Sequence, residues 1–415
     1  MLGRLRKGIS SKQNLIFAIG LICLFYFALW LRMSALDWGL PFRLHPDEWK
    51  YVSAGAECHR GDWNPKYFRN PPGFSYLNAL WYPFWLNIRQ PVSVPEWTGI
   101  DEKWLKPTTH VEATYLYRPF DLVLGGRVLS ALSGAFTCVA VFFLAREFFP
   151  VGYALGTAWL MAVSFANVRE CHFAVNDPSA TCLVTWAMFF GIRGYRCGKR
   201  RWWYSAAALS GIALAFKYNM APGLLALIGL RGLRFWENPN ETTRKRLGID
   251  LFILIALAGI CFLSICPFPI TDPETFFQEM AKLREASVKP WQGQDPRWSG
   301  IQLMETIWIS EGGCTTIFAL LGLGFSLRKR QWAMVLFPLF YVLLILSHQL
   351  FYVRFSLPIL PWISIWGTAI LQAGMERFSL KKAWLIGGAL FFFGLAAWEP
   401  LSKDFRSIFL FKQED

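Results

Sequence analysis

A short acidic motif, His45-Pro46-Asp47-Glu48-Trp49, follows the first apolar run of the chain. Proline and acidic residues are also common in the first turn of a helix, so the motif could mark only a helix start. Successive helix residues lie roughly 100° apart, and Asp47 and Glu48 would therefore point to different faces. One carboxylate could then face a cavity and deprotonate a hydroxyl group while the other supports it.

Three cations are predicted to lie at the same membrane level as this motif: Lys217, Arg354 and, as a further candidate, Arg127. They could neutralise a phosphate at the lipid headgroups, where a polyprenyl-phosphate sugar presents its leaving group. Displacement of a glycosyl phosphate requires stabilisation of that negative charge, which Arg or Lys can supply. The alternative is that these side chains only extend their charged ends to the membrane interface.

Other ionisable residues are predicted on the same side. Asp177 opens the fourth apolar run, and His45 and His172 lie on this side with the other histidines. Ionisable groups inside or at the ends of membrane spans are costly, so their gathering on one side indicates function. The oxygen of Asp47 or Asp177, and the ring of His45, could hold a divalent metal, although their spacing does not require one.

The composition indicates a membrane protein. Of 415 residues, 54% are hydrophobic and 17% are charged, and the mean hydropathy is +0.32. A soluble globule of this length could not cover its surface with so few charges, since about 25% is usual. The nine cysteines form no C-x-x-C pair, which argues against a zinc site or a disulfide framework. Cytosolic enzymes, disordered chains and disulfide-rich secreted domains are thereby excluded.

Hydropathy predicts an all-α integral membrane protein with about eleven transmembrane helices. The first run follows Arg4, Arg6 and Lys7, ends at Arg32 and lacks a signal-peptide cleavage site, so it resembles an uncleaved anchor. The predicted spans are 15–31, 121–145, 151–168, 173–192, 202–216, 219–235, 249–268, 303–327, 332–347, 355–374 and 383–398.

Basic residues set the predicted orientation. Lys and Arg concentrate in the short connections near 193–201, 231–246, 328–330 and 377–382, every second one along the chain. The positive-inside rule then places the N-terminus in the cytoplasm and Asp47 on the extracytoplasmic face of the cell membrane. The net charge of +14 follows from topology, and nucleic acid is excluded as a partner.

Two long extracytoplasmic loops are predicted at about 32–120 and 270–301. Within the first, the apolar stretch 74–88 contains Pro83 and is short for a span, which favours a helix lying in the membrane interface. Residues 1–398 are predicted to form one multi-span domain, and residues 399–415 a short C-terminal tail. The many Trp and Tyr side chains of the loops suit sugar rings or isoprenoid chains, and they suit membrane interfaces equally well.

The chain resembles the GT-C membrane glycosyltransferases, the superfamily of dolichyl-phosphate-mannose protein mannosyltransferases and bacterial lipid A aminoarabinose transferases. The resemblance covers about residues 10–375. It rests on HPDEWKY after the first span, NPPGFSYLNALWYPF at 70–84, GRVLSALSGAFTCVAVFFLAREFF at 126–149, FANVRECHFAVNDPSA at 165–180, Gly-x-Ala-x-Ala-Phe-Lys at 211–217 and FYVRFSLPILP at 351–361.

The resemblance implies a multi-span GT-C fold with juxtamembrane helices in a large first loop, and an inverting transfer from a polyprenyl-phosphate sugar. Asp47 looks like the catalytic acid of the first loop, with Glu48 beside it. Asp177 resembles a second acid near the acceptor or a metal, and Lys217 and Arg354 resemble donor-phosphate contacts. The large C-terminal domain of oligosaccharyltransferases and the luminal domain of protein mannosyltransferases have no counterpart in this sequence, which puts a protein acceptor in doubt.

The leading hypothesis is an inverting hexosyl- or pentosyltransferase of the cell envelope. It would move a sugar from a polyprenyl-phosphate donor to a hydroxyl acceptor on a lipid, a glycan or a protein. The alternative is a flippase or transporter of polyprenyl-phosphate sugars, which needs alternating access instead of a base; a structural scaffold is a third reading. Lipids are the other expected partners. A divalent metal is a possible cofactor, and the sequence leaves open the sugar, polyprenol, acceptor, protein partner and oligomeric state.

Overall fold

The computed structural model describes residues 11–42, 45–89, 109–241, 243–289, 295–377 and 382–413. The predictions for Arg4, Arg6 and Lys7, and for the parts of the two long loops at 90–108 and 290–294, concern residues outside these ranges. Within the described ranges the chain is helical and contains no strand, which confirms the all-α class.

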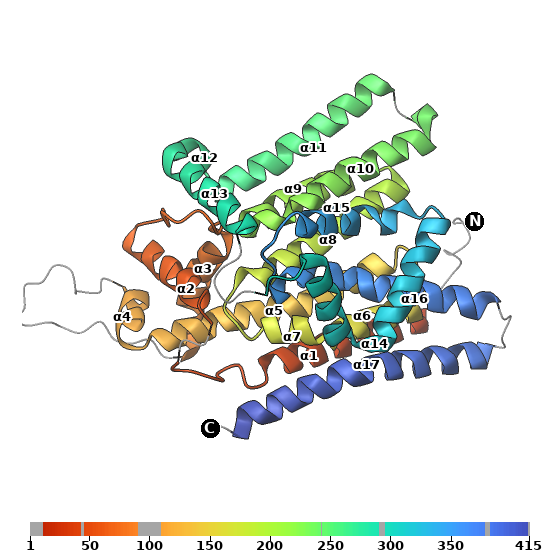
Figure 1. Cartoon of the computed structure of the whole chain (residues 1–415), viewed down its shortest axis with the longest axis horizontal. Coiled ribbons are helices and arrows are strands. Elements are labelled where there is room, and N and C mark those ends of the chain that lie inside the picture. The colour runs from red at the N-terminus through yellow and green to blue at the C-terminus, as the bar shows by residue number, and fades with distance from the viewer. Residues whose placement is uncertain are drawn as a thin grey trace, which may run out of the picture.

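Most of the long helices run along the molecule, and the helices of the two long connections gather at one end of it (Figure 1). At that end lie α2 (Glu48–Glu57), α3 (Gly73–Arg89) and α4 (His110–Tyr117), with α12 (Phe268–Thr271) and α13 (Pro273–Val288) beside them. The long helices are α1 (Ser11–Met33), α5 (Pro119–Ala145), α8 (Asn176–Cys197), α9 (Arg200–Phe216), α10 (Ala221–Glu237), α11 (Arg244–Ile265), α14 (Ser299–Arg328), α16 (Leu360–Arg377) and α17 (Lys382–Gln413).

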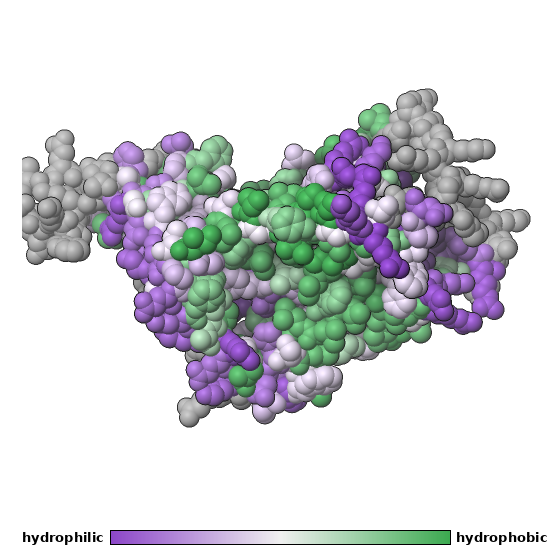
Figure 2. Space-filling model, turned by 90° about the horizontal axis from the view of Figure 1, so that it is seen from above, coloured by the Kyte–Doolittle hydropathy of each residue, from purple (hydrophilic) through white to green (hydrophobic). Residues whose placement is uncertain are grey.

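Within the residues that the structure describes, four helical segments are long and apolar enough to cross a bilayer: Pro119–Ala145, Arg244–Ile265, Ser299–Arg328 and Val353–Arg377. Shorter apolar helices accompany them, among them α6 (Val151–Ala162) and α15 (Leu336–Leu346). An apolar belt covers the middle of the face in Figure 2, with hydrophilic residues toward both ends. The membrane location is thus confirmed, while eleven spans and a cytoplasmic N-terminus stay predictions.

The third predicted span ends earlier than expected. The run 151–168 contains α6, which ends at Ala162, and then a break at Ser164 with extended backbone before the short helix α7 (Phe165–Glu170). Ser164 is the N-cap residue of α7, a position that serine favours. Hydropathy could not detect this break, because the residues on both sides of it are apolar.

Small residues bring neighbouring helices into close contact. A side chain at Gly211 of α9 would overlap the carbonyl oxygen of Ala258 in α11, and one at Gly322 of α14 would overlap that of Trp366 in α16. Apolar side chains gain little by leaving lipid for protein, so close backbone packing of this kind is a main source of helix association in membranes.

The segment between α1 and α5 contains α2 (Glu48–Glu57), α3 (Gly73–Arg89) and α4 (His110–Tyr117). The helix predicted at 74–88 is α3, with Pro83 inside it. Its indole groups bond to the first turns of α5: Trp81 Nε1 donates to Gly125 O at 3.0 Å, and Trp85 Nε1 to Asp121 O at 2.7 Å. The opposite face leaves Leu80 exposed, as an interfacial helix would.

The helices α12 (Phe268–Thr271) and α13 (Pro273–Val288) contact the segment between η1 (Cys58–Arg60) and α3. Phe68 is fully buried, with its ring 4.7 Å from that of Phe268 and 5.7 Å from that of Phe276. Arg69 Nε lies 2.9 Å from an oxygen of Glu279. The two long connections therefore form one layer over the end of the bundle.

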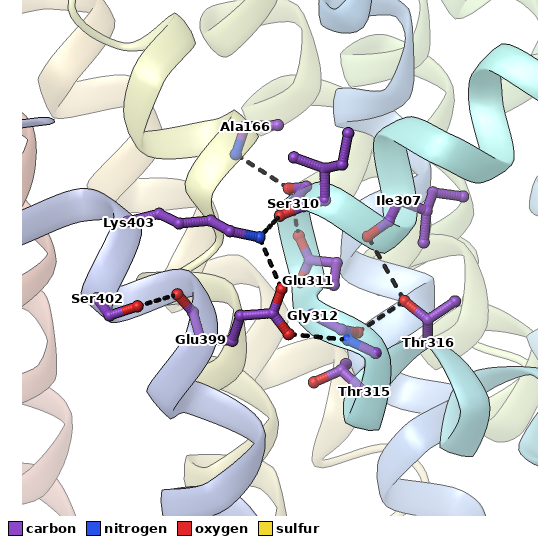
Figure 3. A network of polar contacts seen from close by, with 12 residues as sticks. Ala166, Ile307, Ser310, Glu311, Gly312, Thr315, Thr316, Glu399, Ser402 and Lys403 are labelled. Carbon is purple, nitrogen blue, oxygen red and sulfur yellow. Dashed lines mark hydrogen bonds and ion pairs between the residues drawn. The ribbon is translucent and has the colours of Figure 1, made fainter. Parts of the chain in front are cut away.

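The helix α14 is broken at Gly312, whose φ is +77° (Figure 3). Before the break, Ser310 Oγ accepts from Ala166 N at 3.0 Å and donates to the buried Glu311 at 2.9 Å. After it, Gly313 N donates to Glu399 of α17 at 3.2 Å. Neighbouring helices thereby satisfy polar groups that the break releases, a condition for irregular backbone at membrane depth.

The contact between Glu399 and α14 also bears on the predicted C-terminal tail. The residues from 399 to 413 continue α17 as helix, and Lys403 Nζ donates to Ile309 O and to Glu399, both at 2.7 Å. In the described part of the tail, the chain therefore packs on α14 as an extension of the last helix.

Candidate active site at the end of the bundle

Asp47 is the N-cap residue of α2, but its side chain makes no capping hydrogen bond. The carboxylate turns to two cations instead: Oδ1 accepts from Lys50 Nζ at 2.8 Å, and Oδ2 lies 2.6 Å from NH1 of Arg354. Its side chain is 15% exposed. A partly accessible, ionised carboxylate thus lies between two positive charges.

Arg354 reaches this point from the other half of the chain. It lies in η5 (Val353–Ile359), which leads into α16, and its side chain is 19% exposed. The guanidinium lies 4.7 Å from the ring of Tyr352, and Tyr341 Oη of α15 donates to Phe355 O at 2.9 Å. These contacts hold the start of η5 against the motif that contains Asp47.

Two groups of the motif have shifted pKa values. Burial raises the pKa of Asp47, but Arg354 and Lys50 outweigh it, and the pKa lies below its usual value. Burial, and then the charge of Arg354, lowers the pKa of His45. His45 Nδ1 lies 3.2 Å from the backbone N–H of Asp47 and accepts from it. At neutral pH the site thus contains an ionised Asp47 and a neutral His45.

Glu48 points away from Asp47, as the helical spacing predicts. It is 4% exposed and forms a two-point ion pair with Arg127 of α5, at 2.7 and 3.0 Å. Ala174 N donates to the same carboxylate at 2.8 Å. Arg127 NH1 donates to Leu36 O and Trp38 O, both at 2.8 Å. This buried pair therefore joins α5 to α2, to the segment between α1 and α2, and to the segment before α8.

Asp177 and Lys217 form a second pair beside Arg354. Asp177 lies in the first turn of α8 and is 3% exposed; its Oδ1 accepts from Lys217 Nζ. Lys217 follows the last residue of α9, and its Nζ lies 4.8 Å from the ring of Phe355, the neighbour of Arg354. The four elements α2, α8, α9 and η5 therefore meet here.

Tyr51 lies within electrostatic range of both pairs. It is 4% exposed, and burial together with the negative charges of Asp177 and Asp47 raises its pKa well above the usual value. Neither Tyr51 nor Lys50 was among the predicted site residues. The signal was available, because these residues follow Asp47 by four and three positions, and helical residues at those spacings share a face.

A cavity of about 250 Å³ borders this group. Lys50 and Tyr51 form part of its wall, together with Tyr67 and Asn70 from the segment before α3. Lys50 Nζ lies 5.6 Å from the ring of Tyr67. The wall thus combines aromatic rings with polar groups, one side chain away from Asp47.

His172 bonds to backbone groups elsewhere in the chain. Its ring nitrogens lie 2.8 Å from Val168 O and 2.9 Å from Ser34 O, so it links the end of α7 to the segment after α1. Among the described residues, no three His, Cys, Asp or Glu side chains converge as metal ligands do. Because Asp47 and Asp177 already face cations, the arrangement does not fit a divalent metal.

Part of the chain matches a known family, and nearly all of it matches known structures. The family model of dolichyl-phosphate-mannose-protein mannosyltransferases matches residues 121–265. No curated protein matches the sequence. The apo oligosaccharyltransferase of Archaeoglobus fulgidus has a TM-score of 0.62 and 12% identity, over 95% of this chain and 56% of that protein. This chain thus spans little more than half the length of that enzyme.

Two ligand-bound structures are also similar. ArnT from Cupriavidus metallidurans bound to undecaprenyl phosphate has a TM-score of 0.54 and 15% identity, over 98% of this chain and 73% of that one. AglB from Archaeoglobus fulgidus, in complex with an inhibitory peptide and a dolichol-phosphate, has a TM-score of 0.58 and 10% identity, over 96% and 56%. The GT-C resemblance of the sequence is confirmed at the level of the fold.

Proposed function

We propose that this protein is an inverting glycosyltransferase that moves a sugar from a polyprenyl-phosphate donor to a hydroxyl acceptor. The reaction would occur at the membrane face that carries Asp47, which the orientation of the basic loops predicts to be extracytoplasmic. The observation that carries the proposal is the accessible carboxylate of Asp47, held between Arg354 and Lys50 beside a cavity. The lipid phosphates bound by ArnT and AglB support a donor of this class.

In this reaction Asp47 is the base. The acceptor oxygen attacks the anomeric carbon as its proton passes to Asp47, and the bond from that carbon to the phosphate oxygen breaks on the opposite face. The phosphate leaves with the bonding electrons, so a single displacement inverts the anomeric centre. The lowered pKa keeps Asp47 ionised at neutral pH, ready to accept the proton.

Arg354 and Lys217 are proposed to bind the donor phosphate. Each is paired with a carboxylate, Asp47 and Asp177 respectively, which fixes the position of its charge. A guanidinium has five N–H donors, and Arg354 can therefore hold Asp47 and a phosphate oxygen together. Charge that develops on the leaving phosphate would then meet cations already in place.

Arg127 takes a different part in this proposal. Each of its guanidinium nitrogens has a protein acceptor, and the side chain is 1% exposed. We therefore assign Arg127 and Glu48 to positioning: they fix the start of α2, where Asp47 lies, against α5. His45 would position the same turn through its bond with the N–H of Asp47.

The cavity beside Lys50 is proposed to admit a sugar ring of the donor or acceptor. Its volume of about 250 Å³ lies near the lower end of ligand pockets, which begin at about 300 Å³. The ring of Tyr67 offers a flat apolar face, and Asn70 and Ser75 offer hydrogen-bonding groups.

The break in α14 is the observation that favours a transporter. Interrupted helices with buried charges are typical of transporter binding sites, and Glu311 adjoins such an interruption. Here, however, Glu311 accepts from Ser310 and Ser164, and Gly313 N donates to Glu399. These groups bond to other protein groups instead of facing a substrate path, which makes a flippase the weaker proposal.

A transfer assay with purified protein in nanodiscs tests the function. Radiolabelled polyprenyl-phosphate sugars are offered with membrane lipid and glycan acceptors, and wild type is compared with Asp47→Asn and Asp62→Asn. Asp62 is a matched control, since it pairs with a lysine in the same loop but is 45% exposed. We expect Asp47→Asn to lose at least about 100-fold in rate while it still unfolds cooperatively, and Asp62→Asn to keep activity.

Full transfer activity in Asp47→Asn would refute the role of Asp47 as the base. Translocation of the donor without any transfer, lost in Glu311→Gln and kept in Asp47→Asn, would replace the enzyme with the transporter.

A further inference from the structure

A second cavity, of about 410 Å³, lies between the ends of α9, α10 and α11. Four arginines, Arg200, Arg231, Arg234 and Arg246, line it, and Asp250 is the carboxylate among its lining residues. The lining therefore carries a net charge of about +3 when each arginine is protonated.

The cavity lies at the opposite end of the bundle from Asp47. Asp177 is in the first turn of α8, while α8 ends at Cys197, next to the cavity residue Gly198. The 22 residues of α8 span about 33 Å at about 1.5 Å per residue, which is the thickness of a bilayer core. The two sites therefore face opposite membrane surfaces.

The arginines are held by protein contacts that shape the cavity. Arg231 is 6% exposed, and its NH2 lies 2.6 Å from an oxygen of Asp250 in α11. Arg234 donates to Tyr195 O at the end of α8. Arg200 and Arg246 open the adjoining ends of α9 and α11 and are exposed. Asp250, the carboxylate of the lining, is thus already paired with Arg231.

Gly198 permits this arrangement for two reasons. Its φ is +69°, a conformation that side chains disfavour, and a Cβ there would overlap NH2 of Arg234. Any other residue would thus displace the guanidinium from the wall. The positive-inside rule accounts for basic residues in these loops, but it does not require them to converge on one cavity.

The position of α11 gives lipids access to the cavity. Only 11% of the residues in its most apolar segment are buried inside the protein, against 72% for α5. The side chain of Phe252 in α11 is 71% exposed. Acyl chains can therefore lie along α11 while a headgroup enters beside its first turns. Arginine forks match phosphate oxygens, and basic pockets between membrane helices bind anionic headgroups.

We propose that this cavity binds the phosphate of an anionic phospholipid in the leaflet opposite the Asp47 site, and that the lipid joins the ends of α9, α10 and α11. This site is separate from the proposed donor site and does not depend on the proposed function. The chemistry requires a phosphate group; the membrane position of α11 favours one carried by a lipid over one free in solution.

The test uses the full-length protein in phosphatidylcholine nanodiscs, to which phosphatidylglycerol or cardiolipin is added. Bound lipid is counted by native mass spectrometry and the midpoint of thermal unfolding is measured. Wild type is expected to retain anionic lipid and to unfold at a higher temperature with it. In Arg200→Gln/Arg246→Gln the affinity should fall at least tenfold, while stability in phosphatidylcholine alone stays unchanged because both side chains are exposed.

The double variant Arg328→Gln/Lys329→Gln is the matched control, since it removes the same charge from the exposed end of α14. An equal loss of bound lipid in both double variants would show that only the total positive charge matters, and it would overturn the proposed site. Gly198→Ala keeps every arginine but should also weaken retention. Stabilisation by millimolar inorganic phosphate, with none by anionic lipid, would overturn the lipid assignment.

Discussion

Oδ2 of Asp47, near the start of the chain, lies 2.6 Å from NH1 of Arg354 in its last third. The first residue belongs to the turn before α2 and the second to the turn before α16. Their pairing closes the end of the bundle and brings the candidate base next to a candidate phosphate ligand. It also makes the charge state of Asp47 dependent on cations from two elements.

Lys50→Met should shift the pH dependence of transfer. Arg354 and Lys50 lower the pKa of Asp47, so removal of either cation raises it. Transfer requires ionised Asp47 and is lost as the pH falls through its pKa; the acidic limb of the rate profile should therefore move to higher pH. Lys66→Met, which removes a similar but exposed pair with Asp62, should leave the profile unchanged. An unmoved limb in Lys50→Met would count against Asp47 as the titrating group.

The buried pair of Glu48 and Arg127 should show strong coupling in a double-mutant cycle. Glu48→Gln or Arg127→Met alone leaves a charge buried without its counter-ion, at a cost of about 3–5 kcal/mol in unfolding free energy. The double variant should lose clearly less than the sum of the two. Thermal unfolding in nanodiscs measures each variant, and additive losses would contradict the pairing.

Gly312→Ala should destabilise the protein, whereas Gly324→Ala in the same helix should not. Gly312 has a φ of +77°, and a Cβ there would lie 2.9 Å from an oxygen of Glu399. We expect a loss of roughly 1–3 kcal/mol. Gly324 is helical, with open space around its Cα, and alanine there should be neutral or stabilising. Similar unfolding midpoints for the two variants would argue against the break in α14.

Asp404→Leu should raise the unfolding temperature. Asp404 of α17 is 1% exposed, and neither carboxylate oxygen has a hydrogen-bond partner among the described residues. Burial of a carboxylate without such partners is costly, and an apolar side chain of similar size removes that cost. Glu399→Gln, five residues earlier, should have the opposite effect, because Glu399 bonds to Gly313 N and Lys403. A lowered midpoint in Asp404→Leu would indicate a partner for this carboxylate.

The class of protein and the positions of its helices could be predicted from sequence. A run of about 20 apolar residues can satisfy its backbone hydrogen bonds within lipid by forming a helix. Hydropathy alone therefore located α5, α11 and α14. The motif at 45–51 likewise led to the prediction that Asp47 is a site residue, because acidic residues beside a membrane span are costly to retain. Apolar runs and acidic motifs next to them are formed by residues that are close in sequence, so they can be recognised without the tertiary structure.

The partners of each charged residue depended on the tertiary structure. The sequence suggested one group of cations for a phosphate, but Arg127 is enclosed with Glu48, while Lys217 and Arg354 lie with Asp177 and Asp47. The break at Gly312 and its contact with Glu399 were equally invisible in the local pattern. Ion pairs and helix breaks join residues far apart in the chain, and only the packing of helices decides which of them meet.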